Sequence, residues 1–461
     1  MTFNGRKRRI ASLAFVFFGV ISPTAPAETL SITVPQARKV ALESAVSGRP
    51  DVALTLTQKL LAEDPEDTTA HLASGTAHLA MGDWDAAYSG GRMAFRHAQT
   101  DGQRYQAARV AALAAMGDDR KLISQFWLRR AGDVAPTEVD RTRIERQFRI
   151  LKAQTPLSYR FDFSSTPSSN VNGGSEVAYN VIDGVPLVGV LSADAQALSG
   201  FITQGSVRAK YRFAKSDTSQ TFATAVVYAK HVSLSSSARA AAPGFDAGTL
   251  GATSLEFGLN HARAVGQSNT LLNFKGGFRG QWQAGALSYT ALTAGVDLQH
   301  SLSQKLTFSG GVAYEYRDYA AGGTGTIASA VAGLTYRFAN GNSLTGVARF
   351  SESKTPNVTF DSQSVTGKIT YSLGKPVLST MLSAGVGISQ TDYGDYRLGF
   401  IPVPGGRTDK AIFFDVEAKF TSIEYAGFSP NLKLRHTQNE SNLSRYDTSE
   451  WAVSLGIQSN F

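Results

Sequence analysis

The chain has 461 residues, a formal net charge of +8 at pH 7 and no cysteine. The lack of cysteine excludes disulfides, thiolate metal sites, a cysteine nucleophile and a lipid-modified N-terminal cysteine. Only 18% of the residues are charged, and the 44 glycines, 16 tyrosines and 26 phenylalanines favour strands over helices. A chain of this length is expected to form two or three domains.

Residues 1–27 have the pattern of a secretory signal peptide. The cations Arg6–Arg9 precede the apolar run IASLAFVFFGVI, and 25–27 (APA) supplies small residues for cleavage. An uncleaved membrane anchor is the alternative, but this run is short of the roughly 20 residues that a spanning helix needs. Loss of the four cations takes the net charge from +8 to +4, which does not indicate a nucleic-acid partner.

Residues 34–151 follow a helical pattern with an internal repeat. The segments 47–65 and 81–99 align at an offset of 34 residues, and a weaker copy begins at Gly117. Glycine at the turn, alanine at the helix crossing and proline at the exit resemble the tetratricopeptide repeat. The positions expected to support this packing are Gly48, Ala53, Pro65, Gly75, Gly82 and Ala87. An irregular helical bundle is the alternative fold. If the repeats are present, three of them form a short groove suited to a peptide or a neighbouring protein.

From residue 157 onward the hydrophobic period changes from 3.6 to 2. Alternation and turn residues predict fourteen strands. They are expected to begin near residues 157, 200, 220, 253, 269, 287, 304, 324, 342, 362, 376, 410, 428 and 449. Most are longer than the roughly 5–6 residues of ordinary strands, as tilted strands that cross a bilayer must be.

The predicted connections alternate between short and long. Every second connection is a short turn, such as 303–304 and 339–342, whereas 169–198 and 394–409 are long. Short periplasmic turns and long outer loops characterise outer-membrane barrels. The predicted fold is therefore α plus transmembrane β, with a signal peptide (1–27), a periplasmic tetratricopeptide-repeat-like helical domain (28–154) and a 14-stranded outer-membrane β-barrel (155–461).

The final strand explains why the chain ends on an aromatic residue. Its apolar series is Trp451, Val453, Leu455, Ile457 and Phe461. An unpaired backbone group in lipid is costly, so the last strand is expected to pair with the first and close the barrel. The apolar series is then expected to face lipid, with Ser454, Gly456 and Gln458 facing the lumen. A terminal strand of this kind resembles the signal that the bacterial barrel-insertion machinery reads. A soluble β-sandwich is the alternative.

Basic residues within strands predict the luminal face, because a cation pointing at lipid costs several kcal/mol. The luminal basic positions are Arg208, Lys210, Arg212, Lys433 and Arg435. A basic lumen is either a solvated wall or the path of a polar or acidic client. The seven histidines form no metal motif, and neither a GxSxG elbow nor a phosphate loop occurs, so neither an enzyme nor a cofactor is predicted.

Two segments resemble the surface lipoprotein assembly modulators, a family of outer-membrane translocons. The segment 435–447 (RHTQNESNLSRYD) is similar to the family's penultimate hairpin, and 161–172 (FDFSSTPSSNVN) is similar to its first barrel strand and loop. The matching positions are Pro167, Ser169, Asn170, Asn172, Arg435, Thr437, Asn439, Ser441, Asn442, Tyr446 and Asp447. Gln438, Glu440 and Ser168 depart from the family pattern.

The resemblance implies protein export. Family members help to move surface lipoproteins, and in some branches secreted proteins, across or onto the outer membrane. The expected partners are such a client, the barrel-insertion machinery, a periplasmic chaperone and the lipid bilayer. A polysaccharide exporter is the first alternative, although exporters of that kind carry more repeats; a passive porin is the second, although diffusion requires no helical domain.

The asparagine-rich segments allow two interpretations. Asn170, Asn172, Asn439 and Asn442 either build tight turns at the rim or act where the first and last strands meet. In the second interpretation the junction of these strands opens laterally and releases the client.

Overall fold

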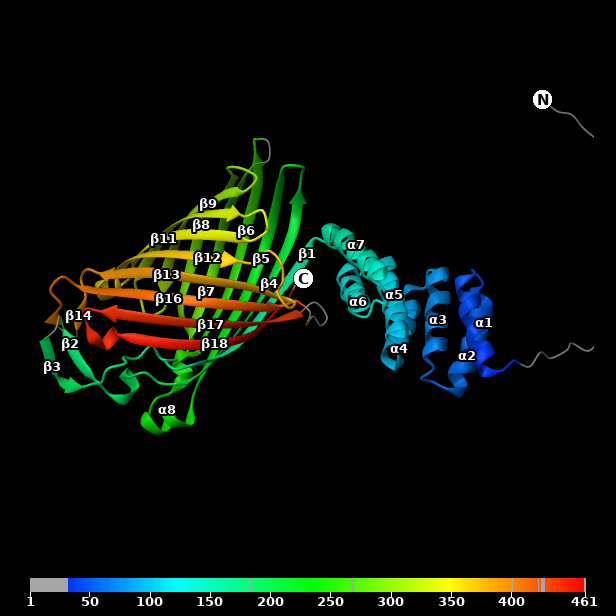
Figure 1. The fold of residues 1–461 in the computed structure, drawn as a ribbon, viewed down its shortest axis with the longest axis horizontal. Helices are drawn as coiled ribbons and strands as arrows, with labels where there is room; N and C mark the ends of the chain where they lie inside the picture. The colour runs from blue at the N-terminus through cyan, green and yellow to red at the C-terminus, as the bar shows by residue number, and fades with distance from the viewer. Residues whose placement is uncertain are drawn as a thin grey trace, which may run out of the picture.

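The computed structural model describes residues 32–182, 185–266, 269–398, 401–421, 423 and 428–459. The expected signal peptide and Phe461 lie outside the described residues. Seven helices come first, and a closed β-barrel follows (Figure 1). The helices lie beyond the end of the barrel at which β1 starts (Figure 1).

The seven helices form three successive hairpins followed by a single helix. They are α1 (Val34–Val46), α2 (Pro50–Glu63), α3 (Thr68–Met81), α4 (Trp84–His97), α5 (Asp101–Gly117), α6 (Lys121–Asp133) and α7 (Glu138–Gln154). Gly48 and Gly82 lie in the α1–α2 and α3–α4 turns with φ 75°, a conformation that glycine adopts without strain. Pro65 lies in the α2–α3 turn, and Ala53 and Ala87 are fully buried. None of the helices in the described part of the chain is long and apolar enough to cross a membrane.

Small residues allow the helices to approach closely. A Cβ added at Gly75 of α3 would lie 3.1 Å from the backbone nitrogen of Gly91 in α4. Two neighbouring glycines of α4 were not predicted. A Cβ at Gly90 would lie 2.7 Å from Gly75 Cα, and one at Gly91 would lie 2.7 Å from the nitrogen of Ala111 in α5. Glycine in α4 therefore sets the distance of both the α3–α4 and the α4–α5 crossings.

Fourteen antiparallel strands form the closed barrel, which confirms the predicted fold class. The strands are β1 (Leu157–Ser168), β4 (Gly200–Lys215), β5 (Ser219–Leu234), β6 (Ala252–Val265), β7 (Thr270–Gln283), β8 (Ala286–Ser301), β9 (Leu306–Tyr319), β10 (Thr324–Arg337), β11 (Ser343–Lys354), β12 (Ser362–Ser372), β13 (Thr380–Tyr393), β16 (Arg407–Phe420), β17 (Phe428–Ser441) and β18 (Thr448–Ser459). Each pairs with its neighbour in the chain, and β18 closes the circle by pairing with β1.

The largest error in the predicted starts concerns β13, which was expected from 376 and begins at Thr380. Leu378 and Ser379 have φ of 49° and 58°, so the chain is still in a turn there. The expected start of β16 at 410 was also wrong, because the strand begins at Arg407. In both cases hydrogen bonding between strands, rather than side-chain alternation, determines the residue at which the strand begins.

The two ends of the barrel differ. Turns at the helical end are short, for example 216–218 and 302–305, whereas longer loops such as 169–199 and 394–406 lie at the other end. These loops hold the hairpins β2 (Tyr179–Ile182) with β3 (Val185–Val190) and β14 (Arg397–Leu398) with β15 (Ile401–Pro402), and the helix α8 (Ser236–Ala241). Figure 1 shows these additions at the end of the barrel away from the seven helices. We call this end the loop rim.

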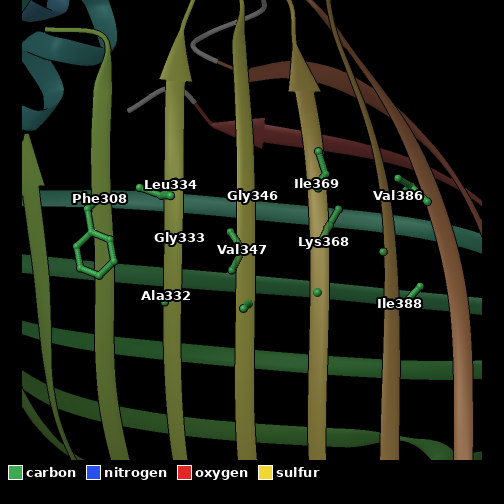
Figure 2. A pocket seen from close by; sticks show the side chains of 13 residues that line it. Phe308, Ala332, Gly333, Leu334, Gly346, Val347, Lys368, Ile369, Val386 and Ile388 are labelled. Carbon is green, nitrogen blue, oxygen red and sulfur yellow. The ribbon is translucent and has the colours of Figure 1, made fainter. Parts of the chain in front are cut away.

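Strand register separates an outward apolar face from a polar interior. Leu334 pairs with Phe308 and Gly346, and Gly346 pairs with Ile369, so these side chains share one face across four strands. Leu334 and Ile369 are 49% and 55% exposed. The small residue Gly346 leaves an apolar hollow of about 620 Å³ in this part of the wall (Figure 2). Such a face is suited to contact with lipid acyl chains.

Candidate functional site at the barrel seam

The junction of β1 and β18, which we call the seam, is the least extensively paired junction of the barrel within the part of the chain that the structure describes. Among the described residues five pairs join these strands, whereas every other pair of neighbouring barrel strands shares at least ten. The pairing with β18 stops after Ser165 and resumes at Ser168, although β1 stays paired with β4 throughout. Pro167 lies in the gap, and proline has no N–H to donate to a ladder.

Side chains connect the two strands on either side of this gap. The Ser168 hydroxyl donates to Glu450 Oε1 at 2.6 Å. Towards the helical end, Gln458 Nε2 donates to Asp162 Oδ1 at 3.2 Å. The seam is therefore closed by a few polar contacts beside a short backbone ladder. Hydrogen bonds to charged groups such as these carboxylates typically contribute about 1.5–3 kcal/mol each.

A polar cavity of about 320 Å³ lies inside the barrel behind the seam. It is lined by Asp162 and Ser164 of β1, Gln204 of β4, Tyr228 of β5, Glu417 of β16, Asn431 and Lys433 of β17, and Ser454 and Gln458 of β18, among others. Tyr228 donates to Gln204 Oε1 at 3.0 Å, and Gln204 Nε2 donates to Ser164 Oγ at 3.3 Å. The inner surface of the barrel wall is thus hydrophilic on both sides of the seam.

The alternate side chains of β18 lie on the outer surface. Trp451, Val453, Leu455 and Ile457 are 50%, 41%, 61% and 46% exposed. The Trp451 ring stacks on His436 of β17 with a centroid distance of 4.3 Å. This face of β18 is therefore continuous with the outward apolar face of the barrel.

Asn170 and Asn172 stabilise the loop that follows β1. Asn170 is 5% exposed; its amide donates to the carbonyl of Gly174 and its oxygen accepts from Gly174 N–H, both at 2.8 Å. The Asn172 amide donates to the carbonyls of Asp194 and Gln196, at 2.9 and 2.8 Å. Both asparagines therefore make hydrogen bonds that stabilise the loop, as expected if they build tight turns at the rim. The loop they stabilise directly follows the β1 strand of the seam.

The hairpin motif stabilises the turn between β17 and β18. Asn439 Nδ2 donates to the carbonyl of Tyr446 at 2.7 Å, and Ser441 N–H donates to Asp447 Oδ1 at 2.7 Å. Asn442 accepts from Thr408 N–H at 2.9 Å and so fixes the turn to the start of β16. Thr437 pairs with Glu450 across β17 and β18.

The loop that follows the first motif segment contacts the second motif segment at the loop rim, although more than 250 residues separate the contacting residues in the chain. Glu176 N–H donates to the carbonyl of Asp447 at 3.0 Å. The Ser175 hydroxyl donates to the carbonyl of Ser444 at 3.2 Å, and the Ser444 hydroxyl donates to the carbonyl of Tyr179 at 3.1 Å. The loop after β1 and the turn before β18 therefore form one bonded unit across the seam.

An aromatic cluster, not predicted from the sequence, supports this unit. The Arg407 guanidinium lies 3.5 Å from the ring centroid of Tyr446 and 4.2 Å from that of Tyr393. It also makes two hydrogen bonds to Asp409 Oδ2, the shorter 2.6 Å long. The hydroxyls of Tyr396 and Tyr446 are hydrogen-bonded. Tyr446 is thus the family-motif residue that connects the turn to the loop 394–406.

Burial, together with the hydrogen bond to Tyr446, raises the pKa of Tyr396 to about 12. A tyrosine in an unfolded chain titrates near 10, so the stability that this cluster contributes is complete below about pH 10 and is lost as the pH rises to about 12. We expect the near-ultraviolet circular dichroism of the tyrosines to change in this window. The variant Tyr396→Phe should lose one late step in a tyrosinate absorbance titration; an unchanged titration would contradict this assignment.

The predicted luminal cations lie in different surroundings. Arg208 and Lys210 line a second cavity of about 610 Å³, and Lys433 lines the cavity behind the seam. Arg435 lies 5.1 Å from the ring of Phe413. Arg212 differs, since it donates to the carbonyl of Ala153 at 2.7 Å and so binds the C-terminal end of α7.

The interior is of mixed charge rather than simply basic. Arg279 forms ion pairs with Glu256 and Glu315, at 3.0 and 3.3 Å, and Arg317 forms one with Glu315 at 2.5 Å. The ion pairs Lys275–Asp297 and Lys368–Asp415 follow the same pattern. Apart from Arg317 with Glu315, which both lie on β9, each pair joins two different strands, so alternation within a single strand gave no sign of it.

No group of three or more His, Asp or Glu residues in the described part of the chain is placed to hold a metal ion. The site consists instead of a weakly paired seam, a polar cavity behind it and a bonded loop unit above it. A closed barrel with an outward apolar face and a polar interior defines an outer-membrane β-barrel protein.

A family model described as surface lipoprotein assembly modifier matches residues 204–461. The chain therefore belongs to this family, and the predicted membership is confirmed. The match includes the hairpin motif and ends with the last residue. No protein of curated function matches the chain.

Solved structures of low sequence identity are also similar. A loop-deletion mutant of OmpT, an outer membrane protein of Vibrio cholerae, is 9% identical, with 66% of this chain and 99% of that chain covered and a TM-score of 0.34. An outer membrane channel from Pseudomonas putida F1 is 10% identical, with 66% and 95% covered and a TM-score of 0.35. The type III secretion translocator chaperone SycD of Yersinia enterocolitica is 19% identical, with 27% and 88% covered and a TM-score of 0.24.

Proposed function

We propose that this outer-membrane protein is a translocon, which moves surface lipoproteins or secreted proteins across or onto the outer membrane. The observation that carries the proposal is the seam: it is the least paired junction among the described strands, and the loop after the first motif segment is hydrogen-bonded to the second motif segment above it. Membership of the surface lipoprotein assembly modifier family supports the class of client.

The helical part is proposed to lie in the periplasm. The short turns at its end of the barrel are typical of periplasmic turns, and the long loops at the other end are typical of the cell surface. In this orientation the short groove of the helical repeats receives the client, or a chaperone that carries it.

The release step is proposed to occur at the seam. A client that carries a lipid anchor needs a polar route for its polypeptide and an exit towards lipid for its acyl chains. The seam offers both, because the cavity behind it is polar and the outward face of β18 is apolar. Opening would require the short ladder, its polar side-chain contacts and the loop contacts above the seam to separate.

Deleting the gene in the native bacterium tests the proposal. We expect one or a few proteins to disappear from the cell surface or the medium and to accumulate in the periplasm, as measured by surface labelling and proteomics of each fraction. Complementation with the intact gene is the control. An unchanged protein profile together with an altered extracellular glycan would overturn the proposal in favour of polysaccharide export.

A further inference from the structure

A small pocket lies where the helices meet the barrel. The cavity has a volume of about 180 Å³ and lies between α6, α7 and β1. Its lining includes Phe126 and Arg129 of α6, Lys152 of α7, and Tyr159 and Phe161 of β1. We call it the junction pocket.

The polar side of the junction pocket is cationic. The Arg129 guanidinium lies 4.5 Å from the ring centroid of Phe148, and Lys152 Nζ lies 6.0 Å from the same ring. None of the described residues that line the pocket is acidic. Burial lowers the pKa of the Lys152 ammonium, and the nearby charge of Arg129 lowers it further. An anion bound between these two cations would stabilise both.

The C-terminal half of α7 extends the positive charge. Residues 146–154 (RQFRILKAQ) include Arg146, Arg149 and Lys152 and no acidic residue. Ile150 lies among them and is 54% exposed. Cations beside an exposed apolar side chain are typical of a helix that contacts an anionic membrane surface.

The apolar side of the junction pocket belongs to the outward face of the barrel. Tyr159 and Phe161 alternate along β1 with Arg160 and Asp162, and Asp162 faces the interior cavity. Other exposed aromatic side chains near this end of the barrel are Tyr211, Phe213, Tyr336, Phe338 and Tyr371. Such aromatic residues mark the level of the lipid headgroups. The pocket therefore lies at the membrane boundary.

We propose that the junction pocket binds the phosphate of an anionic phospholipid from the adjacent leaflet. Arg129 and Lys152 contact the phosphate, and the rings of Phe126, Tyr159 and Phe161 contact the glycerol and the first acyl carbons. With the helices in the periplasm, as proposed above, this is the inner leaflet. The bound lipid holds α6 and α7 against the membrane beside β1. The site does not depend on which client the barrel exports.

The test uses the full-length protein in detergent micelles and a short-chain probe, dihexanoyl phosphatidylglycerol, with bound lipid counted by native mass spectrometry. Lys152→Ala should weaken binding about fivefold, since one cation near a lipid headgroup contributes about 1 kcal/mol. Arg141→Ala is the matched control, because Arg141 lies in the first turn of the same helix and its side chain is 48% exposed. Lys152→Arg keeps the positive charge and should bind the probe as well as the unsubstituted protein does.

Three outcomes would overturn the proposal: no bound lipid, equal weakening by Lys152→Ala and Arg141→Ala, or displacement of the lipid by an equal concentration of inorganic phosphate. The last outcome would identify a site for free phosphate rather than for a lipid. Each variant must show the heat-shifted gel mobility of a folded barrel. The assay measures bound lipid and not export. A negative result would therefore not contradict the proposed export function, and evidence against export would not contradict the lipid site.

Discussion

Oxidation of two introduced cysteines to a disulfide across the seam should reduce client export to the background level of a gene deletion. Ser165 and Leu455 are Cα partners on β1 and β18, so cysteines at both positions lie within the distance that a disulfide requires. The chain has no cysteine of its own, so only the introduced pair can form. Export should return when the disulfide is reduced, and surface labelling of the client before and after reduction measures both states.

The matched control links β18 to its other neighbour. Leu432 of β17 is also a Cα partner of Leu455, so Leu432→Cys with Leu455→Cys places an equivalent disulfide at a junction that is not the seam. We expect this variant to export the client normally in the oxidised state. Normal export by the oxidised Ser165→Cys, Leu455→Cys variant would show that the client leaves through the lumen and that the seam stays closed.

Gly91→Val should destabilise the helical part more than any other single substitution named above. A Cβ at this position would lie 2.7 Å from the backbone nitrogen of Ala111 and 3.1 Å from the carbonyl of Ala107. These are backbone atoms of α5, so the helices must move apart. Overpacking costs about 1–3 kcal/mol, and each kcal/mol lowers Tm by about 4–8 °C in a small domain. Thermal melting followed by circular dichroism at the helical minimum measures the shift.

Gly102→Val is the control for that experiment. Gly102 is also helical, but a Cβ there would meet nothing within 4 Å, so the substitution should leave the melting temperature of the helices nearly unchanged. The barrel should keep its heat-shifted gel mobility in both variants. Equal melting temperatures for the two variants would mean that α4 and α5 lie further apart than the structure shows.

Local patterns made most of the fold predictable. Strand periodicity predicted all fourteen barrel strands, because each strand separates lipid from a polar interior and so must alternate. The repeat of 34 residues identified the glycines at the turns, since only the turn needs a left-handed residue. Gly90 and Gly91 were missed, because close contact between helices depends on the partner helix as well as on the residue itself.

The candidate site was less predictable. The motif segments drew attention to Asn170 and Asn442, but their bonding partners come from residues distant in the chain or from the loop's own backbone. Arg407 was not predicted, because its tyrosine partners come from two separate stretches of the chain, Tyr393 and Tyr396 from one and Tyr446 from the other. A single sequence shows which side chains alternate along a strand, whereas such clusters depend on how loops fold over the rim.

The connection between α7 and β1 has a mechanical consequence. Only Thr155 and Pro156 separate them, and this link is held by Gln125 donating to Thr155 Oγ1 at 2.7 Å and by Arg212 donating to the end of α7. β1 is one of the two strands of the seam. A tilt of the helical array therefore moves that strand directly, and a force applied to the helices by a docked protein reaches the junction with the fewest pairs among the described residues without passing through the other strands.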